Sequence, residues 1–109
     1  MTTSLLRFYV HEGQRCQGRP FWEWLLAEAN RMGLRGGSAF RAMAGFGRHH
    51  RLHESHFIEL AGSLAVEVEF IVDDDEASRL LALIEAQGLR VPYAQLPATL
   101  GVLNPDAGD

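Results

Sequence analysis

The segment with the clearest chemical potential is a run of glycine, arginine and histidine that reads Gly45-Phe46-Gly47-Arg48-His49-His50-Arg51. Glycines let the main chain approach a ligand closely and expose consecutive N–H groups, and neighbouring arginines can neutralise phosphate charge. The run therefore predicts a binding site for a small anion. It is neither the GxGxxG of dinucleotide-binding folds nor a P-loop, and a turn or bulge that closes a strand is an alternative meaning of the two glycines.

The histidines in and after this run allow a second chemistry. They are His49, His50, His53 and His56. Imidazole groups at near spacing suit zinc, copper or nickel, so the alternative function is a metal-responsive module that uses this cluster. If residues 51–57 are extended, however, two of the side chains project to opposite faces. A solvated or subunit-facing polar loop is the third interpretation.

Little in the sequence points to catalysis, and we expect a protein that is not an enzyme and has no cofactor. No serine stands in a GxSxG context. Cys16 is the single cysteine, so neither a disulfide framework nor a CxxC redox pair can form. Glu67 and Glu69 share one face of a strand, where an ion pair with an arginine explains them better than an acid and base.

Length and composition predict one globular domain, because the chain has 109 residues, 47% of them hydrophobic and 22% charged. The first 53 residues carry eight arginines and three acidic residues, whereas residues 54–109 carry two arginines and eleven acidic residues. An anionic ligand would meet the first half, although the charges of the two halves can also simply pair within one fold. The net charge of −4 argues against a nucleic-acid partner. We expect a cytoplasmic protein, since no apolar run approaches the ~20 residues of a membrane span and no signal peptide is evident.

Hydrophobic periodicity predicts the elements that position these residues. Strands are expected over 5–11, 38–44, 64–72 and 89–96, and helices over 20–32 and 73–87. Asp73 and Glu76 form a potential capping pair for the second helix, and Gly33 and Gly88 are placed to end the two helices. Residues 48–56 are expected to form a protruding, mobile loop or hairpin between two strands.

The order β-α-β-β-α-β predicts an α+β fold, the ferredoxin-like βαββαβ sandwich, with a four-stranded antiparallel sheet and two helices on one face. The strand order is then 4-1-3-2, and the last strand lies at an edge, as its Pro92 requires. This domain spans residues 1–96, and residues 97–109 form a mobile C-terminal tail.

The face of the sheet without helices mixes charged and apolar side chains. Because the first and third strands are neighbours, Arg7 can pair with Glu67 and Glu69 across them. Leu5, Tyr9, Ala65 and Ile71 share that face. A second subunit is expected to cover it, and a solvated face on a monomer is the alternative.

The chain resembles the PII-like family known as domain of unknown function 190, and residues 37–48 look like the stretch of PII signal-transduction proteins that leads into their effector loop. The matching features are Glu12, Gly18-Arg19-Pro20, Gly33-Leu34-Arg35-Gly36-Gly37, Arg41, Gly45-Phe46-Gly47, Leu52-His53 and the strand Val66 to Val72. The resemblance implies a homotrimer that binds a small anionic effector, such as an adenine nucleotide, in clefts between subunits. It also implies a protein partner reached through the 48–56 loop, including peripheral contact with a membrane protein.

With this resemblance, the candidate ligand-binding residues are Arg41, Gly45, Gly47, Arg48, His49 and Arg51. Two PII features have no counterpart here. The Gly-x-Gly-Lys turn after the second helix is missing, and no basic residue follows Arg90. PII-type contacts to a triphosphate are therefore not predicted at the end of the chain, and the loop lacks the tyrosine that PII proteins modify.

Overall fold

The computed structural model of the chain describes residues 2–46, 53–54 and 65–108. Its principal elements are β1 (Thr3–His11), α1 (Phe21–Arg31), β4 (Gly37–Arg41), β7 (Ala65–Asp73), α3 (Asp74–Glu85) and β8 (Tyr93–Pro97). Two short ladders accompany them: β2 (Arg15–Cys16) pairs with β3 (Arg19–Pro20), and β5 (Ala44–Gly45) pairs with β6 (His53–Glu54). No helix in these described residues is long and apolar enough to cross a membrane.

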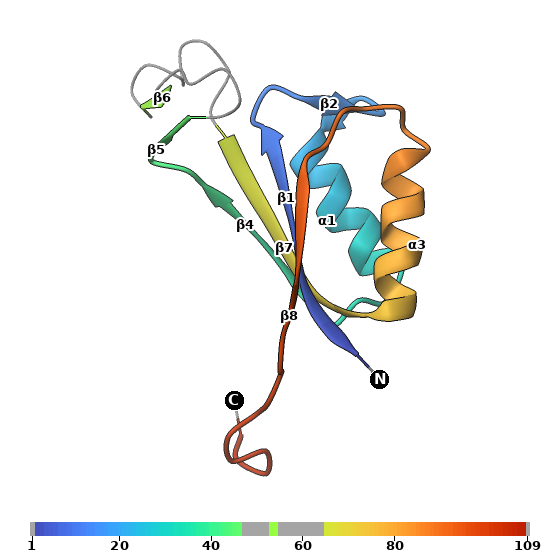
Figure 1. Ribbon diagram of the computed structural model, residues 1–109, viewed down its shortest axis with the longest axis vertical. Helices are drawn as coiled ribbons and strands as arrows, with labels where there is room; N and C mark the ends of the chain where they lie inside the picture. Colours follow the sequence, from blue (N-terminus) through green and yellow to red (C-terminus); the bar gives the residue numbers. More distant parts are fainter. Residues whose placement is uncertain (1, 47–52, 55–64, 109) are drawn as a thin grey trace.

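The four long strands form one antiparallel sheet in the order β4-β7-β1-β8, and both helices cover the same face of it (Figure 1). This is the predicted order 4-1-3-2, so the ferredoxin-like α+β fold is confirmed. β1 and β7 lie at the centre and β8 at an edge, the position predicted for the last strand.

Alternation along the two central strands builds the core. Every second residue of β1 and β7 faces the helices, and the most deeply buried of these are Leu6, Phe8, Val68, Phe70 and Val72. Phe21 and Leu25 of α1 and Leu80 of α3 close the core from the other side. The intervening residues of each strand necessarily point to the opposite, helix-free face.

The second helix begins as its sequence predicts. The side chain of Asp73 accepts a hydrogen bond from the Glu76 N–H at 2.8 Å, and the Glu76 side chain accepts one from the Asp73 N–H at 2.9 Å. This reciprocal capping box satisfies two N–H groups that the first turn of a helix leaves without partners. Gly33 and Gly88 both have positive φ, as the predicted helix-ending positions require.

Three predictions about the secondary structure were wrong. The strand expected over 38–44 divides, because β4 ends at Arg41 and β5 leaves the sheet to pair with β6. The last strand begins at Tyr93 instead of Leu89, and Pro92 contributes only its carbonyl, which accepts from the Tyr9 N–H at 3.0 Å. The stretch read as a loop before the first helix contains the β2–β3 ladder. The extended chain expected near residues 57–60 lies outside the described residues.

Candidate functional site

The candidate site lies at the end of the sheet where the chain departs toward the 48–56 loop. Here β1 finishes at His11, β7 begins opposite it at Ala65, and Arg41 of β4 pairs with Val66. The Ala42 N–H donates to the Ala65 carbonyl at 2.9 Å, which is the last bond to the sheet before β5 turns away. Three strand ends thus converge at the base of the loop (Figure 1).

Arg41, a predicted ligand residue, is joined there to an acid. Its Nη2 donates to Oε1 of Glu12, the residue that follows β1, and the two side chains are 55% and 28% exposed. Glu12 and Arg41 are both features of the family resemblance, but the sequence did not predict that they would contact each other. The contact means that an anion at Arg41 must share the guanidinium with a carboxylate or displace it.

Gly45 lies in β5, where Gly45 pairs with His53 and Ala44 with Glu54. This ladder closes the chain between residues 45 and 53 at its base, in agreement with the predicted hairpin. A Cβ built at Gly45 would meet no atom within 4 Å, so its main chain borders open space. Two large apolar side chains near Gly45 are largely exposed: Met43 is 85% exposed and Phe46 is 67% exposed.

The other predicted ligand residues, Gly47, Arg48, His49 and Arg51, lie outside the described part of the chain. Of the 48–56 loop, only residues 53–54 are described, so its expected mobility is not tested. Of the histidine cluster, only His53 lies in the described part of the chain. Among the residues that are described, no group of three or more His, Cys, Asp or Glu is placed to hold a metal ion. Of the predicted anion site, the structure therefore brings Arg41 and Gly45 to the same end of the sheet.

The helix-free sheet face carries the predicted ion pairs. Arg7 Nη2 lies 2.7 Å from Glu69 Oε1, and its Nε lies 3.6 Å from Glu67 Oε1. A hydrogen bond with the Tyr9 side chain, followed by that with Glu69, raises the pKa of Arg7 above its ordinary value. Phe40 is 54% exposed on this face, and Leu96 is 43% exposed. No element of the described chain covers these side chains.

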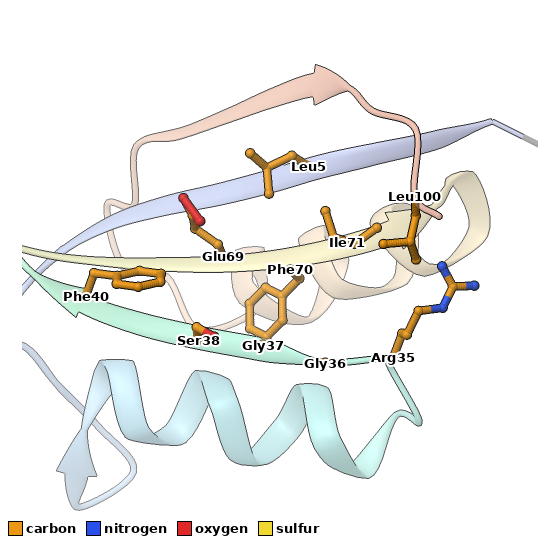
Figure 2. A pocket seen from close by; sticks show the side chains of 10 residues that line it. All are labelled: Leu5, Arg35, Gly36, Gly37, Ser38, Phe40, Glu69, Phe70, Ile71 and Leu100. Carbon is orange, nitrogen blue, oxygen red and sulfur yellow. The ribbon is translucent and has the colours of Figure 1, made fainter. Parts of the chain in front are cut away.

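Sequence reasoning missed a groove at the rim of this face. It has a volume of about 340 Å³, and its walls come from β1, β4, β7 and the segment after β8 (Figure 2). Gly36 and Gly37 are among the residues that line it. Gly37 lies against Phe70, whose buried ring occupies the space that a Cβ would need. The glycine pair in the sequence indicates a break between the first helix and the next strand. It does not indicate that Gly37 packs against Phe70 of a distant strand.

Cys16 is a free cysteine that belongs to the hydrophobic core. Its thiol is buried, with Sγ 3.4 Å from Oε1 of Gln87. Burial raises the pKa of the thiol, and the charge of Glu28 adds to this effect. The neutral thiol is the less reactive form.

Comparison with known proteins gives a consistent family. The family described as DUF190 (Uncharacterized ACR, COG1993) matches residues 3–89. A UPF0166 protein of Aquifex aeolicus (strain VF5) is 35% identical over 84 residues, which are 77% of this chain and 80% of that protein.

Two solved structures of CPII, a nitrogen regulatory PII-like protein from Thiomonas intermedia K12, share the fold. One is bound to ADP, AMP and bicarbonate and has a TM-score of 0.55; the other is bound to ADP and bicarbonate and has a TM-score of 0.53. Each is 18% identical to this chain, and each match covers 90% of this chain and 89% of CPII. The family match agrees with the resemblance found in the sequence, the fold is shared with CPII, and the chain belongs to the DUF190 family.

Proposed function

We propose that this chain is a PII-like regulatory protein, not an enzyme, that assembles as a homotrimer and binds a small anionic effector such as an adenine nucleotide in clefts between subunits. The observation that carries the proposal is the fold shared with CPII, which was solved with ADP, AMP and bicarbonate. Binding would alter the 48–56 loop, through which the trimer contacts a protein partner, including one in a membrane.

The trimer is supported by the helix-free sheet face. Phe40, Leu96 and Tyr9 are exposed there around the Arg7–Glu69 ion pair. Exposed apolar side chains gathered on one face are typical of a surface that another protein covers. Covering it with further copies of the chain buries the aromatic and aliphatic groups and shields the ion pair from solvent.

The anion site is supported by the base of the loop. Gly45 offers open main chain, and Arg41 offers a guanidinium on the adjoining strand end. Arg48 and Arg51 follow Gly45 in the sequence and add two positive charges to this segment. Glu12 is the counter-charge that holds Arg41 until the effector arrives.

Titration of ADP into three variants tests the proposal. Gly47→Val should abolish binding by steric exclusion, and Arg48→Ala should weaken it by about 1.5–3 kcal/mol, the worth of a charge-assisted hydrogen bond. His49→Ala is the matched control at the next position and should change the affinity much less. A metal-responsive protein would show the reverse order when titrated with Zn²⁺. Wild-type protein that binds neither ADP, AMP nor bicarbonate at millimolar concentration would contradict the anion site.

Glu12 and Arg41 give a second pair of variants with opposite expected signs. Glu12→Gln keeps the shape of the side chain but removes the carboxylate charge beside Arg41, and should tighten ADP binding by up to about fivefold, since exposed ion pairs are worth about 0.2–1 kcal/mol. Arg41→Gln should weaken binding. If both substitutions weaken binding alike, the pair serves only to hold the strand ends together.

A further inference from the structure

The segment after β8, residues 98–108, leaves the two-layered fold with exposed apolar side chains. The Ala98 N–H still donates to the Thr3 carbonyl at 3.0 Å, after which the chain runs outside the sheet and hooks back on itself (Figure 1). Val102 is 73% exposed and Leu103 is 92% exposed. Adjacent large aliphatic residues at this exposure are typical of a segment that docks on another surface. We call residues 98–108 the C-terminal arm.

The groove at the rim of the sheet is a surface that suits such side chains. Leu5, Phe40, Ile71 and Leu100 line it with apolar groups, and Gly36 and Gly37 border it without side chains (Figure 2). Leu100 belongs to the arm of the same subunit, but the more exposed Val102 and Leu103 do not line the groove beside it. Its volume of about 340 Å³ is at the small end of the range of ligand pockets, about 300–1,000 Å³.

Charge supports a partner with an acidic group next to its apolar side chains. Arg35 stands at the Leu100 end of the groove (Figure 2), and no residue described in the structure forms an ion pair with it. On the arm, Asp106 follows the two aliphatic residues and likewise has no ion-pair partner within the described chain. An arm of this composition thus complements the groove in both apolar surface and charge.

We propose that Val102 and Leu103 of one subunit occupy the groove of the next subunit, with Asp106 near the neighbour's Arg35. The occupant is thus a second copy of this chain. Because arm and groove are different surfaces of the subunit, the contact is heterologous, and repeating it closes a ring when the rotation is one third of a turn. This inference rests on the homotrimer of the proposed function and adds the segment that links its subunits.

Cysteine cross-linking tests the arm contact directly. In the 109-residue chain, Ser38→Cys places a thiol on the exposed rim of the groove, and Leu103→Cys places one on the arm. Cys16 is buried and should not interfere. Mild oxidation of the double variant should yield covalent species up to a trimer on a denaturing gel. The matched control replaces Ser38→Cys by Asp75→Cys, at an exposed position on α3, and should yield no covalent trimer.

Light scattering on the same samples separates the two proposals. A trimeric protein that forms only an intrachain disulfide, or no disulfide, overturns the arm contact and leaves the trimer intact. A monomeric protein overturns the trimer and the arm contact together. Equal cross-linking by the Asp75→Cys control would also overturn the arm contact, because it would show that the arm reaches surfaces without preference.

Discussion

Gly37→Ala is the substitution whose effect the packing predicts most sharply. A Cβ at Gly37 would lie 2.6 Å from Cδ1 of Phe70, closer still to its Cε1, and 3.3 Å from Cδ2 of Leu26. Such approaches are well inside van der Waals contact. The Phe70 ring is 2% exposed and packs edge-on against Phe8, with ring centroids 6.2 Å apart, so its room to move aside is small.

The expected magnitude combines two opposing effects. Overpacking of a core typically costs about 1–3 kcal/mol. Replacing glycine by alanine also restricts the unfolded chain and returns about 0.4–1 kcal/mol, and Gly37 has no positive φ that would oppose alanine. We therefore expect Gly37→Ala to lower the free energy of unfolding by about 0–2.6 kcal/mol, or Tm by up to about 10 °C at fixed protein concentration.

Gly36→Ala is the matched control, because a Cβ at Gly36 meets no atom within 4 Å and its φ is also not positive. It should be neutral or slightly stabilising. In a Phe70→Leu background, the added methyl group has space, and the cost of Gly37→Ala should largely disappear. Urea denaturation of the four variants measures these differences. If Gly37→Ala is as stable as Gly36→Ala, the close approach of β4 to Phe70 is refuted.

Three further changes test other features. Asp73→Ala removes the capping box and should lower the free energy of unfolding in urea by about 0.5–2 kcal/mol; an unchanged midpoint would mean that the cap contributes nothing. Folding raises the pKa of the Cys16 thiol, so the folded state binds the thiol proton more tightly than the unfolded state does. The resulting contribution to the free energy of unfolding is fully present below the ordinary pKa of 9.0 and is lost as pH rises toward the folded pKa. Cys16→Ala should accordingly show a shallower alkaline decline in stability than wild type, and an equal slope would contradict the shift. Glu69→Gln should promote dissociation on dilution, followed by light scattering, more than Glu67→Gln, because Arg7 lies 2.7 Å from Glu69 and 3.6 Å from Glu67; the opposite order would argue against a covered ion pair.

The parts of the fold that could be predicted are those governed by local periodicity. Alternation in β1 and β7 fixed which residues face the helices, and Asp73 with Glu76 marked the start of α3 correctly. The cross-strand pairing of Arg7 with Glu69 followed from the neighbouring positions of these two strands in the βαββαβ order.

The features that sequence reasoning missed depend on contacts between distant segments. Nothing near Arg41 in the sequence indicates that Glu12 is its partner, because the two meet only when the ends of β1 and β4 converge. Likewise, the groove is lined by residues that are distant in the sequence, among them Gly37, Phe70 and Leu100. The strand predicted over 38–44 divides at Ala42 because residues 44–45 pair with β6 and not with the sheet. Local sequence propensity does not indicate this change of partner.

Native mass spectrometry of the full chain with increasing ADP tests the central claim most directly, because it reads subunit number and bound ligand together. We predict a species of three 12.1 kDa chains that takes up ADP in successive steps to a maximum of three. The Gly47→Val protein should keep the three-chain mass without the ligand steps. A monomer that takes up no ADP from the wild-type chain would contradict both the trimer and the nucleotide site.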